Sequence, residues 1–346
     1  MKQESAVPTP PRSPWQHFYG AMHALRWHWY ARRSSRLPRP VISVGNIHWG
    51  GAGKTPIVAA IARYLRDKGK VVAILSRGYG SQAKGIRVVS TGEGPLLGPL
   101  VAGDEPVLLA SELPGVAVVV APNRAEAGLH AMERLSPPPD FFVLDDGFSH
   151  LKLFREVDLV VFPAADRWAG GRLLPGGRLR EPLSSLDRAD AVILSDASQT
   201  EAEEFARQLQ AFNFTGPGFS SRVAVRLPEL PDGQEMSPGT AVLVVTAIAR
   251  PRRVVDSVRQ LGLEVADVLT FSDHHNYPEG SIRKINEKFQ ESRASAIVTT
   301  SKDHVKLLGR LEAPLAQLPI QAEPDPSFFG WLDQRLVQAA TLETPE

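Results

Sequence analysis

Hydrophobic residues follow two alternating patterns along most of this chain. Short unbroken apolar runs predict strands buried on both faces of a sheet, and these runs lie at 41–44, 71–75, 116–121, 141–144, 157–162 and 191–194. Between them, apolar residues recur every three or four positions, which predicts helices at 55–67 and 123–135. Because strands alternate with helices, we expect an α/β fold with a mostly parallel sheet and helices on both faces.

A second and smaller block with the same alternation follows a linker that lies within 228–239 and is rich in proline and glycine. Its predicted strands are 241–245, 264–269 and 296–299, and its predicted helices are 252–261 and 280–292. The sequence therefore predicts a first α/β domain at 37–227, a smaller α/β domain at 228–322, and a C-terminal helix at 323–346 that returns to the first domain.

The segment before the first strand differs from the rest of the chain. Residues 1–14 are polar and proline-rich, which predicts a disordered lead. Residues 15–36 predict an amphipathic helix, because apolar residues recur at helical spacing at Trp15, Phe18, Tyr19, Met22, Leu25, Trp29 and Tyr30. This helix either packs on the domain behind it or faces a membrane. Its arginines, which lie beside the aromatic residues, favour the membrane surface.

Composition narrows the class of protein. The chain has 346 residues, 43% of them hydrophobic and 22% charged, as is ordinary for a soluble globular protein. A formal net charge of +1 gives no reason to expect a nucleic-acid partner. The absence of cysteine excludes disulfides, a thiol nucleophile and a cysteine-ligated metal site. No apolar run is long enough for a transmembrane helix, and the polar start does not resemble a signal peptide, so export is not expected.

A glycine-rich turn between the first strand and its helix predicts a nucleotide site of the P-loop NTPase type. The turn reads Gly50, Gly51, Ala52, Gly53, Lys54 and Thr55. Glycines let backbone N–H groups point at phosphate oxygens, and the helix N-terminus adds a positive dipole end. We expect Lys54 to reach the β- and γ-phosphates of ATP and Thr55 to bind Mg²⁺. The first glycine of the usual pattern is replaced by His48.

Two aspartates supply the second part of a nucleotide site. Asp145 and Asp146 end the apolar strand at 141–144. A carboxylate in this position holds Mg²⁺ directly or through water. Alternatively, the two aspartates cap a turn or a helix. This alternative is less favoured because a phosphate loop precedes them in the same chain. We therefore expect Thr55, Asp145 and Asp146 to form the metal site.

Two further polar stretches allow a structural and a functional interpretation. Asp104 and Glu105 precede a helical stretch, so they can be N-terminal helix acids, or one of them can be the general base that accepts a hydroxyl proton. The stretch 272–275 carries His274 and His275 after a strand. Adjacent strand residues point to opposite faces, so a shared metal is not expected and a surface turn is favoured.

Cations gather where the predicted strands end. Arg77 and Tyr79 follow the strand at 71–75, and Arg124 opens a helix. The long segment 169–182 is too polar for the core, and it carries Arg172, Arg178 and Arg180. Because sites in α/β proteins form at the carboxyl edge of the sheet, this segment predicts a functional loop. For each arginine taken singly, a solvated surface residue is the favoured interpretation.

Taken together, these stretches resemble the tetraacyldisaccharide 4'-kinase family, the lipid A 4'-kinases of Gram-negative bacteria. The matching stretches are 43–46, 50–56, 76–80, 103–106, 144–148, 171–177, 179–182, 273–275 and 299–303, in family order. The resemblance implies that ATP phosphorylates the 4'-hydroxyl of a tetraacylated glucosamine disaccharide 1-phosphate to give lipid IVA. It also implies a peripheral enzyme at the cytoplasmic face of the inner membrane, attached through the N-terminal helix.

The resemblance implies roles for particular residues. Asp104 matches the catalytic base, and His274 matches the partner that orients and polarises it. Lys54, Thr55, Asp145 and Asp146 match the phosphate and Mg²⁺ positions. The residues expected to bind the substrate are Arg77, Tyr79, Glu105, Arg124 and Arg180. If the base and its histidine lie on different domains, they meet only when the domains close, which would limit idle ATP hydrolysis.

Two positions depart from the family pattern, and several other functions compete with this one. Ser149 replaces the usual glutamine, which puts the role of that side chain in doubt, and Ser301 replaces the usual glutamate.

A regulatory P-loop ATPase would carry a lysine at the position that Trp49 occupies here. A GTPase would need a motif that recognises the guanine base, and the stretch 300–303 does not have the spacing of that motif. A kinase of a small soluble metabolite shares the same loop, but the aromatic and cationic helix at 15–36 favours a lipid.

Overall fold

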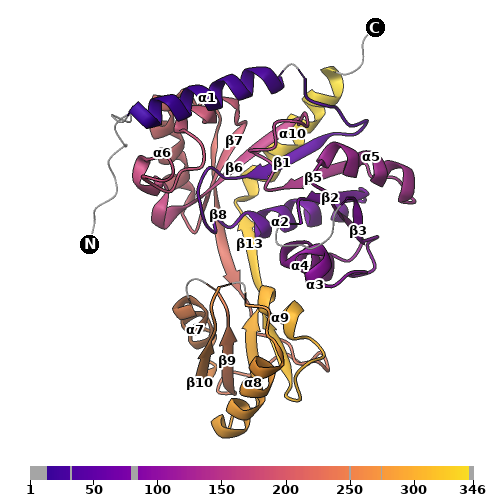
Figure 1. Ribbon diagram of the computed structural model, residues 1–346, viewed down its shortest axis with the longest axis vertical. Helices are drawn as coiled ribbons and strands as arrows, with labels where there is room; N and C mark the ends of the chain where they lie inside the picture. Colours follow the sequence, from indigo (N-terminus) through magenta and orange to yellow (C-terminus); the bar gives the residue numbers. More distant parts are fainter. Residues whose placement is uncertain (1–13, 32, 79–84, 249–250, 274, 343–346) are drawn as a thin grey trace. The chain divides into compact units, whose positions relative to one another are not determined.

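The computed structural model describes residues 14–31, 33–78, 85–248, 251–273 and 275–342. These residues group into two compact units, shown in Figure 1. The larger unit contains the described residues up to Ala102, then Leu109–Val223, and those from Ala322 onward. The smaller unit contains Gly103–Leu108 and the described residues of Ala224–Gln321. The short segment Gly103–Leu108 therefore belongs to the smaller unit, although its neighbours in sequence belong to the larger one.

The larger unit is built on a nine-stranded sheet with the order β13-β8-β7-β6-β1-β5-β2-β4-β3. Its strands are β1 Val41–Gly45, β2 Val72–Ser76, β3 Arg87–Ser90, β4 Val116–Val120, β5 Phe141–Asp145, β6 Val157–Pro163, β7 Ala191–Ser195, β8 Gly218–Val225 and β13 Ile320–Pro324. Strands β1, β2 and β4 to β8 pair in parallel, whereas β3 runs antiparallel to β4. The last residues of β8 and the first of β13 fall in the smaller unit.

Helices cover both faces of this sheet, as predicted. The helices of the larger unit are α1 Pro14–Ala31, α2 Lys54–Asp67, α3 Pro99–Ala102, α5 Arg124–Arg134, α6 Gln199–Leu209 and α10 Pro326–Leu342. Alternate residues of the central strands, such as Val41 and Phe142, form a core cluster with the alanines of α5. Helix α2 packs on β1, β2 and β5. The long apolar runs in the sequence follow from this burial on two faces.

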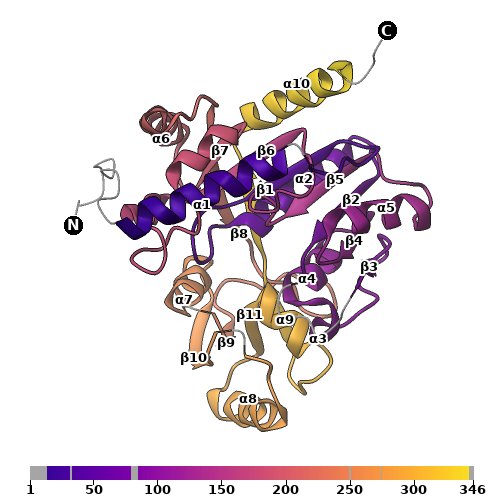
Figure 2. The ribbon, with the colours of Figure 1, turned by 45° about the horizontal axis from the view of Figure 1, so that its top comes forward.

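The smaller unit has its own parallel sheet with the order β10-β9-β11-β12. Its elements are β9 Ala241–Thr246, α7 Pro251–Gln260, β10 Glu264–Thr270, α8 Glu279–Ser292, β11 Ala296–Thr300, α9 Ser301–Leu307 and β12 Leu315–Leu318. Figures 1 and 2 both show α7 beside β10. Two separate core clusters, one on each face of the sheet, hold the unit together.

The prediction that segment 169–182 is too polar for the core is wrong. Ala169, Leu173 and Leu179 are buried with Trp168 and Phe205 in one core cluster. The segment forms short turns rather than a regular element, so its few apolar residues can face inward while its glycines and arginines remain outside. Hydrophobic spacing in the sequence does not reveal this arrangement, because the segment has no regular period.

Candidate active site

The glycine-rich turn joins the end of β1 to the start of α2. Gly53 is the N-cap of α2 and has a φ of 82°, and Gly50 has a φ of 115°. These left-handed conformations favour glycine. A Cβ atom on Gly53 would also lie 3.1 Å from the Ser195 hydroxyl. The backbone therefore forms a tight loop at a helix N-terminus, which is the arrangement that binds phosphate.

His48 occupies the position of the first glycine in the usual phosphate-loop pattern. Its buried ring lies edge-on to Phe162, and its Nε2 is 3.2 Å from the carbonyl oxygen of Arg167. Burial lowers the pKa of His48 to about 4, so the ring is neutral at pH 7. His48 also forms an antiparallel bridge with Leu179. A large buried side chain thus replaces the missing glycine and attaches this stretch to the segment that carries Arg180.

Backbone hydrogen bonds complete this attachment. The Trp49 N–H donates to the Arg178 carbonyl at 2.7 Å, and the Arg180 N–H donates to the Ile47 carbonyl at 2.7 Å. Arg180 is therefore brought to the phosphate loop by pairing between two segments that are far apart in sequence. The residue pattern identified Arg180 as one of several cations near a sheet edge, and the family resemblance implied that it binds the substrate.

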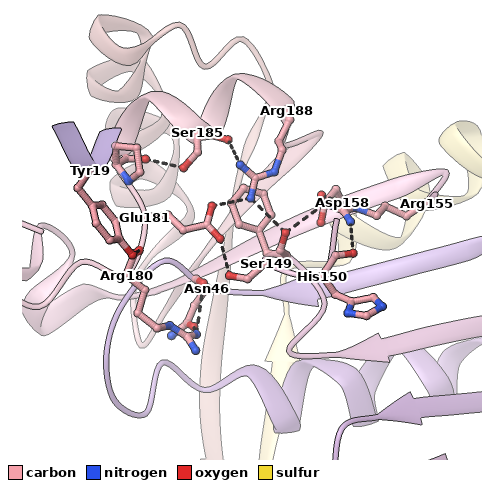
Figure 3. Close-up of polar contacts among 12 residues, drawn as sticks. Tyr19, Asn46, Ser149, His150, Arg155, Asp158, Arg180, Glu181, Ser185 and Arg188 are labelled. Atoms are coloured by element: carbon pink, nitrogen blue, oxygen red, sulfur yellow. Dashed lines mark hydrogen bonds and ion pairs between the residues drawn. The ribbon is translucent and has the colours of Figure 1, made fainter. Parts of the chain in front are cut away.

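Four side chains converge beside the phosphate loop. Lys54 Nζ lies 3.3 Å from Asp146 Oδ1 and 3.2 Å from Asn46 Oδ1. Arg180 Nη2 lies 3.1 Å from the same Asp146 oxygen and hydrogen bonds to Asn46 (Figure 3 labels Arg180 and Asn46). Burial raises the pKa of Asp146, but Lys54 and Arg180 outweigh it and hold the pKa below its usual range. Asn46 was not among the predicted site residues, although its position just after the first strand was a usable signal.

Asp145 and Asp146 lie where β5 ends, next to β1 in the sheet. The register pairs Val44 with Asp145, so the end of β5 reaches the start of the glycine-rich turn. Asp145 is buried and accepts a hydrogen bond from the Ser76 hydroxyl at 3.3 Å. Within the described parts of the chain, no group of three or more acidic, histidine or cysteine residues could hold a metal. Mg²⁺ is usually bound by one or two carboxylates together with substrate phosphates.

Buried and exposed cations lie on the other side of β5. Arg124 is the first residue of α5, is 5% exposed, and has Nη1 3.4 Å from His150 Nδ1. Burial, with the nearby charge of Arg77, lowers the pKa of Arg124 to about 10. Burial and Arg124 lower the pKa of His150 to about 3, so this ring is neutral. Arg77 is exposed at the end of β2, and Tyr79 lies outside the described residues.

The smaller unit carries the predicted base. Asp104 is the first residue of α4 Asp104–Glu112, and its Oδ2 lies 2.6 Å from Lys306 Nζ. Glu105 Oε1 lies 2.5 Å from Lys302 Nζ. Both lysines belong to the stretch 301–307 that forms α9, four residues apart, so they share one helix face. Lys306 was missed by sequence reasoning, and this four-residue spacing was the available signal.

The histidine stretch belongs to the same unit as Asp104. His274 lies outside the described residues. His275 stacks on Phe271 and its Nε2 is 2.8 Å from the Ser281 hydroxyl. Because Gly103–Leu108 groups with this unit, Asp104 lies in the same unit as His275. The hypothesis that Asp104 and His274 lie on different domains stays a prediction, because His274 is outside the described residues.

These features define a phosphotransferase of the P-loop class. A model of the tetraacyldisaccharide-1-P 4'-kinase family matches residues 12–337. The tetraacyldisaccharide 4'-kinase of Syntrophus aciditrophicus is 37% identical over 90% of this chain and 88% of its own length. That of Anaeromyxobacter dehalogenans is 40% identical over 84% of this chain and 79% of its own length. The chain belongs to the tetraacyldisaccharide 4'-kinase family, which confirms the resemblance seen in the sequence.

A solved structure agrees with this assignment. The crystal structure of LpxK from Aquifex aeolicus in complex with ATP has a TM-score of 0.74 and 32% sequence identity to this chain. The match covers 94% of this chain and 97% of that one. The predicted fold class is therefore confirmed for nearly the whole chain.

Proposed function

We propose that this chain transfers the γ-phosphate of ATP to the 4'-hydroxyl of tetraacyldisaccharide 1-phosphate, giving lipid IVA. The observation that carries the proposal is the convergence of Lys54, Asp146 and Arg180 at a phosphate loop in a chain of this kinase family. The products are ADP and a disaccharide with a second phosphate.

The glycine-rich turn is the phosphate site in this proposal. The backbone N–H groups of the 50–55 loop and the Lys54 ammonium hold the β- and γ-phosphates. Arg180 stabilises the negative charge that spreads over the phosphoryl oxygens during transfer. Asp145, Asp146 and Thr55 would hold Mg²⁺, which would neutralise negative charge on the phosphates. We assign Arg77, Tyr79 and Arg124 to the binding of the phosphate-bearing substrates.

Asp104 is the proton acceptor in this proposal. The 4'-oxygen forms a bond to the γ-phosphorus while the bond from that phosphorus to the β-phosphate oxygen breaks. The hydroxyl proton passes to the Asp104 carboxylate. We assign His274 as the partner that orients Asp104, and the contacts of Lys306 and Lys302 support the placement of Asp104 and Glu105.

The activity is tested with ATP labelled on the γ-phosphate, Mg²⁺, and the disaccharide monophosphate in detergent. We expect the label to move to the lipid and the product to carry two phosphates. A parallel reaction with a sugar lacking acyl chains tests the alternative of a small soluble acceptor. Label transfer to that sugar with none to the lipid would refute the lipid kinase.

Helix α1 supports attachment to the inner membrane. Along one face, large apolar residues are more than half exposed: Phe18 at 59%, Met22 at 55%, Leu25 at 70% and Trp29 at 52%. The opposite face contacts the larger unit, where Tyr19 packs against a core cluster. Arg26 and Arg33 lie over the rings of Tyr30 and Trp29. An apolar stripe beside arginines suits the boundary between lipid headgroups and acyl chains. Within the described residues, no helix is long and apolar enough to cross a bilayer.

Replacing both Phe18 and Leu25 with serine is expected to weaken binding to vesicles of anionic phospholipid by a factor of about 30 or more. Each large apolar side chain contributes about 1.5–3 kcal/mol when fully buried, and 1.4 kcal/mol corresponds to about a tenfold change. Vesicle sedimentation measures the effect. The matched control is Leu129→Ser with Leu308→Ser, which are exposed at 48% and 65% but lie outside α1. Equal vesicle binding by both double variants would rule out α1 as the membrane contact.

A further inference from the structure

A buried ion pair lies next to Arg180 in the chain. Glu181 follows Arg180, and its Oε2 is 2.6 Å from Arg188 Nη2. Figure 3 shows this contact between Glu181 and Arg188. The side chain of Glu181 is only 3% exposed and that of Arg188 only 5%. Burying two charges is unfavourable unless each finds close partners. The pair is therefore expected to have further contacts that use the arginine fork.

Those further contacts reach the turn that follows Asp146. Arg188 Nη2 donates to the Phe148 carbonyl at 3.1 Å, and its guanidinium lies 3.6 Å from the centre of the Phe148 ring. The Ser149 hydroxyl donates to Glu181 (Figure 3). Ser149 is the residue that replaces the family's usual glutamine, and its short side chain here pairs with the buried glutamate. One ion pair thus contacts both the segment of Arg180 and the turn of Asp146.

A second buried arginine holds the same turn. Arg155 Nη2 donates to the Phe148 carbonyl at 3.1 Å, and its Nη1 donates to the His150 carbonyl at 2.8 Å. Asp158 balances the charge of Arg155, with Oδ2 at 2.7 Å from its Nε. Arg155 and Arg188 therefore both donate to the Phe148 carbonyl, and Arg155 also donates to the His150 carbonyl. This is an unusual amount of buried charge for one short turn.

The backbone of Asp146 gives a reason for these contacts. Its φ is 54°, a left-handed conformation that is uncommon for residues other than glycine. Such a conformation persists when surrounding contacts fix it, and it occurs often at functional sites. The turn also packs closely under β1, since a Cβ on Gly45 would lie 2.4 Å from the Phe148 Cβ. Contacts that hold Phe148 therefore help to hold Asp146.

We propose that Arg188 is a positioning residue for phosphoryl transfer: through Glu181 and the Phe148 carbonyl it keeps Arg180 and Asp146 in contact at the phosphate loop. The proposal rests on the proposed roles of Arg180 and Asp146. The planar guanidinium of Arg188 donates hydrogen bonds to the Glu181 carboxylate and to the carbonyl oxygens of Phe148 and Ser185. A lysine has no fixed fork and cannot match these acceptors together.

Helix α1 contacts the same network. The Arg188 guanidinium lies 5.4 Å from the centre of the Trp27 ring, and the Tyr19 hydroxyl donates to the Arg180 carbonyl at 3.2 Å. The inner face of the helix that carries the exposed apolar stripe is thus in contact with the residues that place Arg180.

Arg188→Gln and Arg188→Lys test the proposal by steady-state kinetics in detergent. A displacement of about 1 Å can lower a rate by about 10²-fold, so we expect kcat of the glutamine variant to fall by at least about tenfold, with KM for the lipid nearly unchanged. The lysine variant should recover part of kcat. Arg207→Gln is the matched control, because Arg207 also pairs with a glutamate but both side chains are exposed. A folded Arg188→Gln enzyme with normal kcat would overturn the proposal.

A further variant covers the case in which Arg188→Gln does not fold. Replacing Glu181 with leucine and Arg188 with methionine removes both buried charges together, which proteins often tolerate. Ser149→Ala removes only the hydroxyl donor to Glu181 and preserves the ion pair. We expect a clear loss of kcat in the double variant and a smaller loss in Ser149→Ala, which keeps the contacts of Arg188 with Glu181 and Phe148. Normal kcat in the folded double variant would overturn the proposal. If Arg180→Gln and Asp146→Asn keep normal kcat, then the proposed site itself is wrong. If those two are inactive while the Arg188 variants are normal, only the positioning role fails.

Discussion

Replacing Asp104 with asparagine is expected to lower kcat for lipid phosphorylation by a factor of about 10² to 10⁴, the usual contribution of a general base. Asparagine has the same size and remains a good residue at a helix N-terminus, but it cannot accept the hydroxyl proton. The substitution therefore separates the two interpretations of Asp104. A residue that only starts α4 would tolerate it, whereas a base would not.

The measurement is kcat with labelled ATP, accompanied by thermal unfolding and nucleotide affinity. The asparagine side chain still offers an oxygen to Lys306, whose side chain is 7% exposed and would otherwise lose the partner at 2.6 Å. ATP affinity should stay near the wild-type value, because the phosphate loop and Lys54 belong to the larger unit. Glu279→Gln is the control in the smaller unit, since Glu279 is 89% exposed in its pair with Arg310. Normal kcat in folded Asp104→Asn enzyme would remove the base assignment.

Replacing Lys54 with methionine is expected to weaken ATP binding and to lower kcat by a factor of about 10² to 10³, the usual effect of removing one preorganised donor to developing charge. Methionine keeps the length and apolar stem of lysine but brings no cation to the β- and γ-phosphates. The measurements are ATP affinity by calorimetry and kcat in detergent. Lys68→Met is the control, because Lys68 lies just after the other end of α2 and pairs with Asp333 on an exposed surface.

The same variant should change the pH dependence of the reaction. Burial raises the pKa of Asp146, while Lys54 and then Arg180 lower it below the usual range. Without Lys54 the pKa of Asp146 rises, so the carboxylate takes up a proton at a higher pH than in the wild type. The acid limb of the profile of kcat/KM against pH should therefore move to higher pH. An unchanged acid limb together with normal ATP affinity would show that Lys54 does not serve this site.

Regular elements with strong local patterns were predictable from the sequence. Each predicted strand of both units begins and ends within a residue or two of the observed strand. For the central strands of the larger unit the reason is burial on two faces, which leaves an unbroken apolar run. Four strands were not predicted, namely β3, β8, β12 and β13. Strand β3 is short and antiparallel at the edge of the sheet, and its first residues are not fully buried. Helix α6 was also missed, although Ser198 and Glu201 form a capping box at its start.

The direction of side chains on α1 shows what spacing alone cannot decide. The spacing of apolar residues predicted a helix, but it did not separate the inner from the outer face. Trp29 is exposed and Trp27 lies near Arg188. A vesicle test that changes both tryptophans would therefore mix lipid contact with the packing around Arg180. Which residues of an amphipathic helix face solvent depends on the surface behind it.

The sequence by itself determined the phosphate loop, because its chemistry is local: glycines, a lysine and a hydroxyl must be consecutive between a strand and a helix. It also determined the paired aspartates at the end of β5 and the family. Only the tertiary structure showed that Asp146 lies within ion-pair distance of both Lys54 and Arg180. It also showed that the Ser149 hydroxyl donates to Glu181 and that Gly103–Leu108 belongs to the smaller unit. These are contacts between segments far apart in the chain, and no periodicity or local propensity encodes them.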